Sequence, residues 1–313
     1  MSKEQKVNPT TGPGHPDNAL LNEEHVLTPG GWRPKSKVHL IEAGHHVSGE
    51  AGRLRIINTF TKEIVRDFGE IPKKGGKEPN MPGSVYVPEL KKVLTPFGSL
   101  VPAYGTGWIT FAGWTNSSGH PISSFSTSWV VPPPPATSSG QTIFIFNGIQ
   151  NSGFILQPVL QWGSSFAGGG DYWAIANWYV DGQGGLALHS PLVRVNSGDS
   201  LHGLMSLTSQ TGNLYSYVSS FVGYPSTSLT IANIEQLTWA NETLEAYGIT
   251  KCSDYPSTTK TAMTSIELKV DNVEATINWQ PVNAATECNQ HCVVVSNSSP
   301  DGEVDIFYNM GTV

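Results

Sequence analysis

Short apolar segments alternate with turn residues along the chain from about residue 104 onward. The segments are rich in Val, Ile, Phe, Tyr and Trp, whereas Gly, Pro, Ser and Asn lie between them, and this pattern is typical of β-strands. No long amphipathic helix interrupts the pattern. So many short strands predict an all-β fold, a two-sheet antiparallel β-sandwich. The predicted strands are residues 108–113, 124–131, 142–146, 155–162, 172–180, 201–208, 214–222, 228–231, 243–248, 264–270 and 306–309.

One of these strands carries two glutamines. Residues 155–163 read ILQPVLQWG, and because side chains alternate along a strand, Gln157 and Gln161 share a face with Ile155 and Val159. A buried amide must find hydrogen-bond partners. It can also donate to a developing oxyanion and accept from a water, which makes it a candidate catalytic group when a carboxylate stands opposite. Glu245 could supply that carboxylate.

The order of motifs around Gln157 resembles that of the eqolisins, the glutamic peptidases of fungi and bacteria, whose catalytic pair is a glutamine and a glutamate. The resemblance covers roughly residues 104–313. Residues 195–200 are similar to the family's Gly-Asp turn, and residues 243–247 to the segment with its catalytic glutamate. The motifs that carry the resemblance are, in order, Gly148-Ile149, Ile155-Leu156-Gln157, Trp162-Gly163, Gly168-Gly169-Gly170 and Tyr172 to Trp178-Tyr179.

The glutamate segment departs from the family pattern in one respect. Eqolisins often have a second glutamate four residues upstream of the first, whereas Glu242 here lies three residues upstream of Glu245. This departure leaves the choice of glutamate open.

The resemblance implies a fold, an activity and a mechanism. The fold is a curved, concanavalin-like β-sandwich, and the activity is that of an acid-active endopeptidase that hydrolyses peptide bonds without a covalent intermediate. Glu245 would act as general base on a water, while Gln157 positions that water and stabilises the oxyanion. A carboxylate base must be ionised to act in acid, so its pKa should lie near or below the usual value.

Five further residues are predicted to bind substrate. Trp108 resembles the tryptophan that lies beside the cleft in eqolisins, and Gln161 would support Gln157. The other three residues, Trp173, Asn177 and Tyr179, lie on the aromatic strand 172–180 and share one face with Ile175. They would form substrate subsites if that face lines the groove.

Charge divides the chain into two regions. Residues 1–100 hold 14 Lys and Arg against 11 Asp and Glu, whereas residues 101–313 hold 4 against 14. We therefore predict a basic N-terminal extension, residues 1–100, before a β-sandwich domain, residues 101–313. Eqolisins are made as zymogens, so the resemblance implies a pro-segment, although a permanently packed extension is the alternative. Within the extension, residues 1–35 look irregular, residues 37–41 and 54–57 look like strands, and residues 69–83 look like a linker.

Several classes of function are not expected. The chain has no Gly-x-Ser-x-Gly, Walker or His-Glu-x-x-His motif, and the grouping of Cys288, His291 and Cys292 does not match a metal site. We predict no metal and no cofactor. A formal net charge of −7 and the lack of a basic stripe argue against nucleic acid, and no apolar run is long enough for a transmembrane helix.

The start of the chain and its cysteines bear on the cellular compartment of the protein. The polar start of the chain predicts a cytoplasmic protein, or a secreted one whose leader has been removed. Cys252, Cys288 and Cys292 permit one disulfide and leave one thiol. We expect a monomer whose partner is a polypeptide substrate.

Two rival functions remain. In a carbohydrate-binding or glycan-active sandwich, tryptophans would stack on sugar rings while Gln157, Gln161 and Asn177 bind hydroxyl groups. A noncatalytic eqolisin-like protein is the second rival. A contact between Gln157 and Glu245, direct or through one water, would favour the peptidase, because a lectin does not need that pair.

Overall fold

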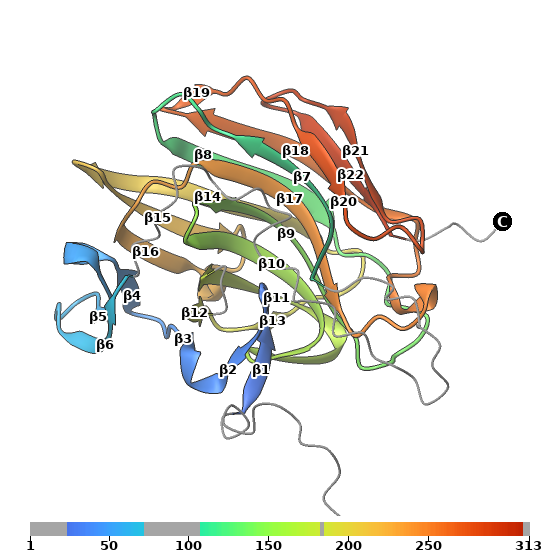
Figure 1. Ribbon diagram of the computed structural model, residues 1–313, viewed down its shortest axis with the longest axis horizontal. Helices are drawn as coiled ribbons and strands as arrows, with labels where there is room; N and C mark the ends of the chain where they lie inside the picture. The colour runs from blue at the N-terminus through green and yellow to red at the C-terminus, as the bar shows by residue number, and fades with distance from the viewer. Residues whose placement is uncertain (1–23, 72–106, 182–184, 309–313) are drawn as a thin grey trace, which may run out of the picture.

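The computed structural model describes residues 24–71, 107–181 and 185–308, and these residues form two large β-sheets (Figure 1). The first sheet, sheet I, has nine strands, eight of them along one path, and β13 (Val193–Arg194) pairs with β11 beside that path. In spatial order the path is β20 (Gln280–Asn283), β7 (Gly107–Thr115), β17 (Trp239–Tyr247), β9 (Thr142–Gln150), β10 (Phe154–Ser165), β11 (Gly168–Asp181), β12 (Ala187–His189) and β3 (Val38–Leu40).

The second sheet, sheet II, has eleven strands, and β19 (Val273–Glu274) pairs with β18 beside the main path. In spatial order that path is β21 (His291–Ser296), β22 (Gly302–Phe307), β18 (Lys260–Val270), β8 (Ile122–Val130), β14 (Ser200–Thr211), β15 (Leu214–Phe221), β16 (Leu229–Ile234), β4 (His45–Ser48), β5 (Arg53–Asn58) and β6 (Ile64–Glu70).

The main hydrophobic core lies between the two sheets. Leu156 and Leu160 of β10 belong to this core together with Trp129, Met205 and Tyr217 of sheet II, and all five are almost fully buried. Because side chains alternate along β10, Gln157 and Val159 point to the opposite, outer face of sheet I. That outer face has an apolar cluster of its own, which includes residues 144, 146, 155, 159 and 178.

The N-terminal segment, residues 24–71, contacts both sheets. Its first two strands, β1 (His25–Thr28) and β2 (Gly31–Pro34), form a hairpin that lies beside β10, β11 and β13 at the bottom of Figure 1. Strand β3 then pairs in parallel with β12 in sheet I, and β4 pairs in parallel with β16 in sheet II. The segment therefore extends one edge of each sheet.

The prediction of an all-β, two-sheet sandwich is confirmed, and each strand predicted beyond residue 104 coincides with an observed strand. The predicted segments 37–41 and 54–57 are β3 and β5. The predicted boundary at residues 100/101 lies outside the described residues, as do most of residues 1–35 and of the linker 69–83. In the described parts of the chain, no helix is long and apolar enough to span a membrane.

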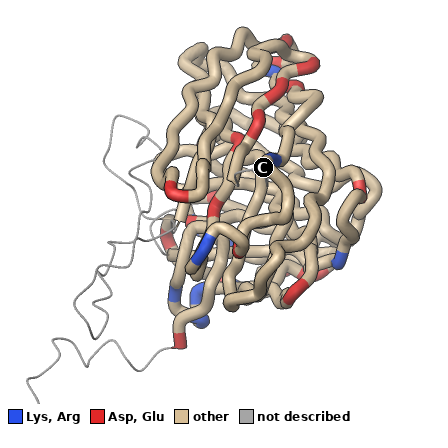
Figure 2. Tube along the Cα trace, turned by 90° about the vertical axis from the view of Figure 1, so that its right-hand side faces the viewer, with Lys and Arg blue, Asp and Glu red and all other residues tan. Residues whose placement is uncertain are grey.

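Two other sequence features are visible in the structure. Charged residues are sparse over the sandwich, as Figure 2 shows. Cys252 and Cys288 form a disulfide that closes a separation of 36 residues, and Cys292 is a buried free thiol.

Candidate active site on the outer face of sheet I

The strand register places Gln157 and Glu245 on the same face of sheet I. Glu245 on β17 pairs with Phe144 on β9, and Phe144 pairs with Gln161 on β10. Side chains of directly paired residues point to the same side of a sheet, so Glu245 shares a face with Gln161 and hence with Gln157. We call this outer surface the Gln157 face.

The Gln157 face is concave, and the β1–β2 hairpin lies in it. The backbone N–H of Gly30, in the hairpin turn, donates to Glu245 Oε1 at 2.7 Å. A Cβ on the same Gly30 would lie 3.2 Å from Val180 Cγ1 on β11, three strands away from β17. One residue can reach both strands only if the sheet curves around it.

Arg33 anchors the hairpin on this face. Its side chain is fully buried, and its guanidinium donates to Thr28 Oγ1 at 2.7 Å and to the carbonyl oxygen of Gly185 at 2.9 Å. Further bonds reach the carbonyl oxygens of Asp181 and Leu186 at 3.3 and 3.2 Å. The positive charge also lowers the pKa of Glu245.

Glu245 is a fully buried carboxyl group whose two oxygens differ in environment. Oε1 accepts from Gly30 N–H and from the Tyr247 hydroxyl, whereas Oε2 has no hydrogen-bond partner among the described residues. Burial raises the pKa of Glu245 to about 7, and the donors Tyr247, Gly30 and Trp108 together with the Arg33 charge oppose this rise. With the hairpin in place, Glu245 is therefore protonated at acidic pH.

The two glutamines of β10 have different roles. The Gln161 amide donates to the carbonyl oxygens of Gly163 and Gly168 at 2.8 and 2.9 Å, and its Oε1 accepts from Ser165, so this side chain braces the turn between β10 and β11. Gln157 is equally buried, but its Oε1 has no partner among the described residues. Only Gln157 thus presents an unused acceptor.

No hydrogen bond joins the side chains of Gln157 and Glu245 within the described part of the chain. The residue opposite Gln157, across Gly148 on β9, is Asn241 on β17. Asn241 is also the residue four positions upstream of Glu245, where eqolisins often have a second glutamate. An amide, and not a carboxylate, therefore faces Gln157 directly.

Trp108 lies on the Gln157 face beside Glu245. The two residues pair between β7 and β17, and the Trp108 ring packs edge-on against Phe146 with centroids 5.8 Å apart. The Trp108 side chain also lowers the pKa of Glu245. The structure thus brings this predicted residue to the candidate base.

The structure places the other three predicted substrate-binding residues on the opposite, inner face of sheet I. Trp173 packs against Trp162, and Tyr179 stacks on Phe154, in the core between the sheets. Asn177 donates to the Thr227 carbonyl oxygen at 2.7 Å and accepts from Ser219. The pairing of Gln157 with Trp178 sets this orientation, because Trp178 shares the Gln157 face and its neighbours Asn177 and Tyr179 point the other way.

Glu242 also points into the core between the sheets. It is fully buried, accepts from Thr127 Oγ1 of sheet II at 2.5 Å, and has its pKa raised well above the usual value by burial. Because Glu242 and Glu245 are three residues apart on one strand, they face opposite sides of sheet I. Only Glu245 shares the face of Gln157.

Sequence reasoning missed four residues of this face: Gly30, Arg33, Asn241 and Tyr247. Tyr247 could have been found, because it lies two residues beyond Glu245 and must share its face. The hairpin residues carry no such signal, since they contact the site only through the tertiary fold.

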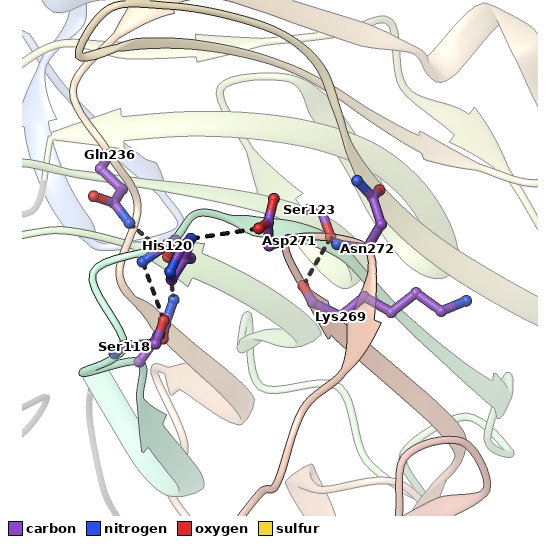
Figure 3. Close-up of polar contacts among 8 residues, drawn as sticks. Ser118, His120, Ser123, Gln236, Lys269, Asp271 and Asn272 are labelled. Carbon is purple, nitrogen blue, oxygen red and sulfur yellow. Dashed lines mark hydrogen bonds and ion pairs between the residues drawn. The ribbon is translucent and has the colours of Figure 1, made fainter.

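A separate polar cluster joins loops at the strand ends and not the strands that hold Gln157 and Glu245 (Figure 3). Gln236 donates to the His120 carbonyl oxygen at 2.8 Å, and His120 lies 3.4 Å from Asp271. Both members of this ion pair are about two-thirds exposed, so it contributes little to stability. The cluster fixes loops and does not belong to the candidate site.

Comparison with known proteins gives matches in structure only. No family model and no curated protein sequence matches the chain. Scytalido-glutamic peptidase, solved with a peptide-based transition-state analogue, is 16% identical to this chain in sequence, with a TM-score of 0.42. SCP-B, a member of the eqolisin family of peptidases solved with the tripeptide Ala-Ile-His, is also 16% identical, with a TM-score of 0.38. Each match covers 64% of this chain and 98% of the other.

A third solved structure, the CBM2 module of the evolved Dit of Lactobacillus casei BL23 phage J-1, is 11% identical with a TM-score of 0.28 and covers 65% of this chain and 71% of the other. The first two neighbours are glutamic peptidases, the family that the sequence motifs resemble. Similarity at this level assigns no activity to the chain.

Proposed function

We propose that the protein is an acid-active endopeptidase that hydrolyses polypeptides on the Gln157 face. Glu245 acts as general base on a water and then delivers the proton to the leaving nitrogen. The Gln157 amide positions that water and stabilises the tetrahedral oxyanion. The observation that carries this proposal is the hydrogen bond from the Gly30 backbone N–H to Glu245 Oε1, because it shows that this face already holds polypeptide backbone against the candidate base.

The hairpin-bound form is the inactive state in this proposal. With a pKa of about 7, Glu245 is protonated at the acidic pH where a base must be ionised. Departure of the hairpin would return water to Glu245 and remove the burial that raises its pKa, so the carboxyl group would ionise at lower pH. Tyr247 would continue to orient Oε1, which leaves Oε2 for the water.

We also propose that residues 1–100 act as the pro-segment of this zymogen and that histidines release it in acid. His39 on β3 and His46 on β4 lie on the two strands that join the segment to the sheets. Burial is the main cause that lowers the pKa of His39 to about 4, and burial also lowers the pKa of His46. Protonation of His39, which would place its charge near His189 of β12, therefore favours the released state. Protonation of Glu245 favours the closed state, so release in acid requires that the histidines outweigh Glu245.

Glu245→Gln tests this function, with Glu242→Gln as the matched control on the other face of the same strand. Both variants and the parent protein are incubated with a reduced, carboxymethylated protein substrate from about pH 2 to 7. We expect cleavage that peaks in acid, a loss of at least about 100-fold in Glu245→Gln, and parent-like cleavage in Glu242→Gln. Parent-like activity of Glu245→Gln contradicts the proposed role.

Polypeptide binding without hydrolysis is the second candidate function. The observation in its favour is Asn241, which places an amide and not a carboxylate opposite Gln157. A protein of this kind would bind unfolded polypeptide in acid but cleave none of it at any pH. The experiment above separates the two functions when bound and cleaved substrate are both measured.

A further inference from the structure

A single row of residues, aligned by the strand register, crosses five strands of the Gln157 face. Asn241 on β17 pairs with Gly148 on β9, which lies opposite Gln157 on β10. Gln157 pairs with Trp178 on β11, and Trp178 pairs with His189 on β12. At about 4.8 Å per strand, the four steps cover roughly 19 Å along the curved sheet, which is the length of about six extended residues.

Each side chain in this row, apart from Gly148, has a polar atom that is buried and has no partner among the described residues. These atoms are Asn241 Nδ2, Gln157 Oε1, Trp178 Nε1 and His189 Nε2. All four residues are at least 96% buried. Unpartnered buried polar atoms cost folding free energy, and here four of them are aligned along one row of the sheet.

The hydrogen bonds that the row residues make with their neighbours determine which row atoms can donate to a ligand and which can accept from it. Thr243 donates to Asn241 Oδ1 at 2.8 Å, so the Asn241 amide offers its N–H groups to a ligand. His189 Nδ1 lies 2.8 Å from the Ser190 carbonyl oxygen, which requires an N–H at Nδ1, and burial lowers the pKa of His189, so the neutral ring has an acceptor at Nε2. The row thus presents donors at Asn241 and Trp178 and acceptors at Gln157 and His189.

Gly148 lets the side chains of Asn241 and Ile155 pack closely over β9. A Cβ at this position would lie 3.3 Å from Asn241 Oδ1 and 3.0 Å from Ile155 Cδ1. Because glycine has no side chain, the Asn241 amide can lie over this strand, on the side that faces Gln157.

The β1–β2 hairpin covers the Gln157 face without using the row. Its polar contacts with sheet I include those of Gly30, of Arg33 and of the Leu27 carbonyl oxygen, which accepts from Phe166 N–H, and the Leu27 side chain adds apolar contact in the cluster that includes Trp178. The four row atoms have no partner in the hairpin or in the other described residues. A ligand that paired with the row would therefore make hydrogen bonds that the hairpin does not.

We propose that the row of Asn241, Gln157, Trp178 and His189 binds the backbone of an extended polypeptide that lies across the strands of sheet I. Backbone C=O groups accept from Asn241 and Trp178, and backbone N–H groups donate to Gln157 and His189. Backbone recognition tolerates any side-chain sequence, so the ligand class is unfolded polypeptide in general. This inference rests on the proposed function and adds Asn241, Trp178 and His189 as substrate-binding residues.

The test measures binding separately from cleavage. The full-length protein with Glu245→Gln, which prevents turnover, is titrated with fluorescein-labelled, carboxymethylated ribonuclease A between pH 3 and 7. Gln157→Met and Asn241→Leu are then added to this variant singly and together. We expect each to weaken binding at least about tenfold, and the pair to weaken it little more than either one, because both hold the same ligand segment.

Asn147→Leu is the matched control, because Asn147 is a buried asparagine beside Gly148 whose side chain points into the core between the sheets. This variant should bind like its parent.

Thermal melting supplies a second readout. Gln157→Met removes an unpartnered acceptor, so its Tm should equal or exceed that of the parent, whereas a purely structural role for Gln157 predicts a lower Tm.

Three results overturn the proposal: unchanged binding in both row variants, no binding by the parent at any of these pH values, or binding of soluble cello- and chito-oligosaccharides in place of polypeptide. Failure of the proposed peptidase function looks different. In that case the protein cleaves nothing, while polypeptide binding still depends on Gln157 and Asn241.

Discussion

Two buried carboxyl groups on β17 couple the protonation of the protein to its stability. Burial raises the pKa of Glu245 to about 7 and that of Glu242 well above its usual value. The folded state therefore holds these protons more tightly than the unfolded state. Their contribution to stability is complete below the unfolded value near 4.5 and is lost as the pH rises through the folded value.

The unfolding free energy of the parent relative to Glu245→Gln should fall by about 3 kcal/mol between pH 4.5 and 7. The difference between two variants is measured because histidines such as His39, with a pKa lowered to about 4, act in the opposite direction in the same range. Urea denaturation at several pH values gives this difference. A value that does not change with pH contradicts the buried, protonated Glu245.

Side-chain alternation predicted which residues share a face, but not which face lines the site. Gln157 and Gln161 do share a face, as do Trp173, Asn177 and Tyr179, yet the second group faces the core between the sheets. The orientation of a strand depends on which of its sides the other sheet covers. That information lies in residues far away in the sequence, such as Ser219 and Thr227, which bind Asn177.

The hairpin turn is the element on which the closed state depends. Gly30 has a φ of +82°, and a Cβ there would lie 3.1 Å from Arg33 Nη2 and 3.2 Å from Val180 Cγ1. Any other residue would strain the backbone and press on both neighbours. The same turn supplies the N–H that Glu245 accepts.

Gly30→Ala should weaken the closed state by about 1 kcal/mol and raise polypeptide cleavage at pH 6 about fivefold. Gly119→Ala is the control, because Gly119 has a φ of +80° with open space around its Cβ position. It carries the same backbone strain but not the hairpin contacts. Initial cleavage rates measure the effect, and equal rates in the two variants would show that the hairpin does not close the site.

The strands of the sandwich could be predicted, whereas those of the N-terminal hairpin could not. The apolar segment β10 forms a strand because it buries both faces, and the alternating segment β14 because it buries one, and both patterns are local. Residues 25–34 contain Pro29, Gly30 and Gly31 in succession and have no clear period. Their conformation depends on contact with sheet I, including the bond from Phe166 N–H to the Leu27 carbonyl oxygen.

At the scale of the whole molecule, the N-terminal segment belongs to both sheets. Strand β3 pairs with β12 over three residue pairs, and β4 pairs with β16, so the segment lies at one edge of each sheet. The bonds of Arg33 to the backbone near the end of β11 add a third attachment. None of these contacts depends on the peptide bonds between residues 72 and 106.

Cutting the polypeptide and releasing the segment are consequently two independent events. Trypsin cleavage at Lys73, Lys74, Lys77, Lys91 or Lys92 should give two pieces that elute together in gel filtration at pH 7, because the β-ladders still hold them. The pieces should separate in acid, and the larger one would then expose the unpaired edges of β12 and β16. Separation already at pH 7 would contradict this expectation. After a proteolytic cut the two pieces would therefore stay together until acid separates them, and the newly exposed strand edges would make the larger piece prone to self-association.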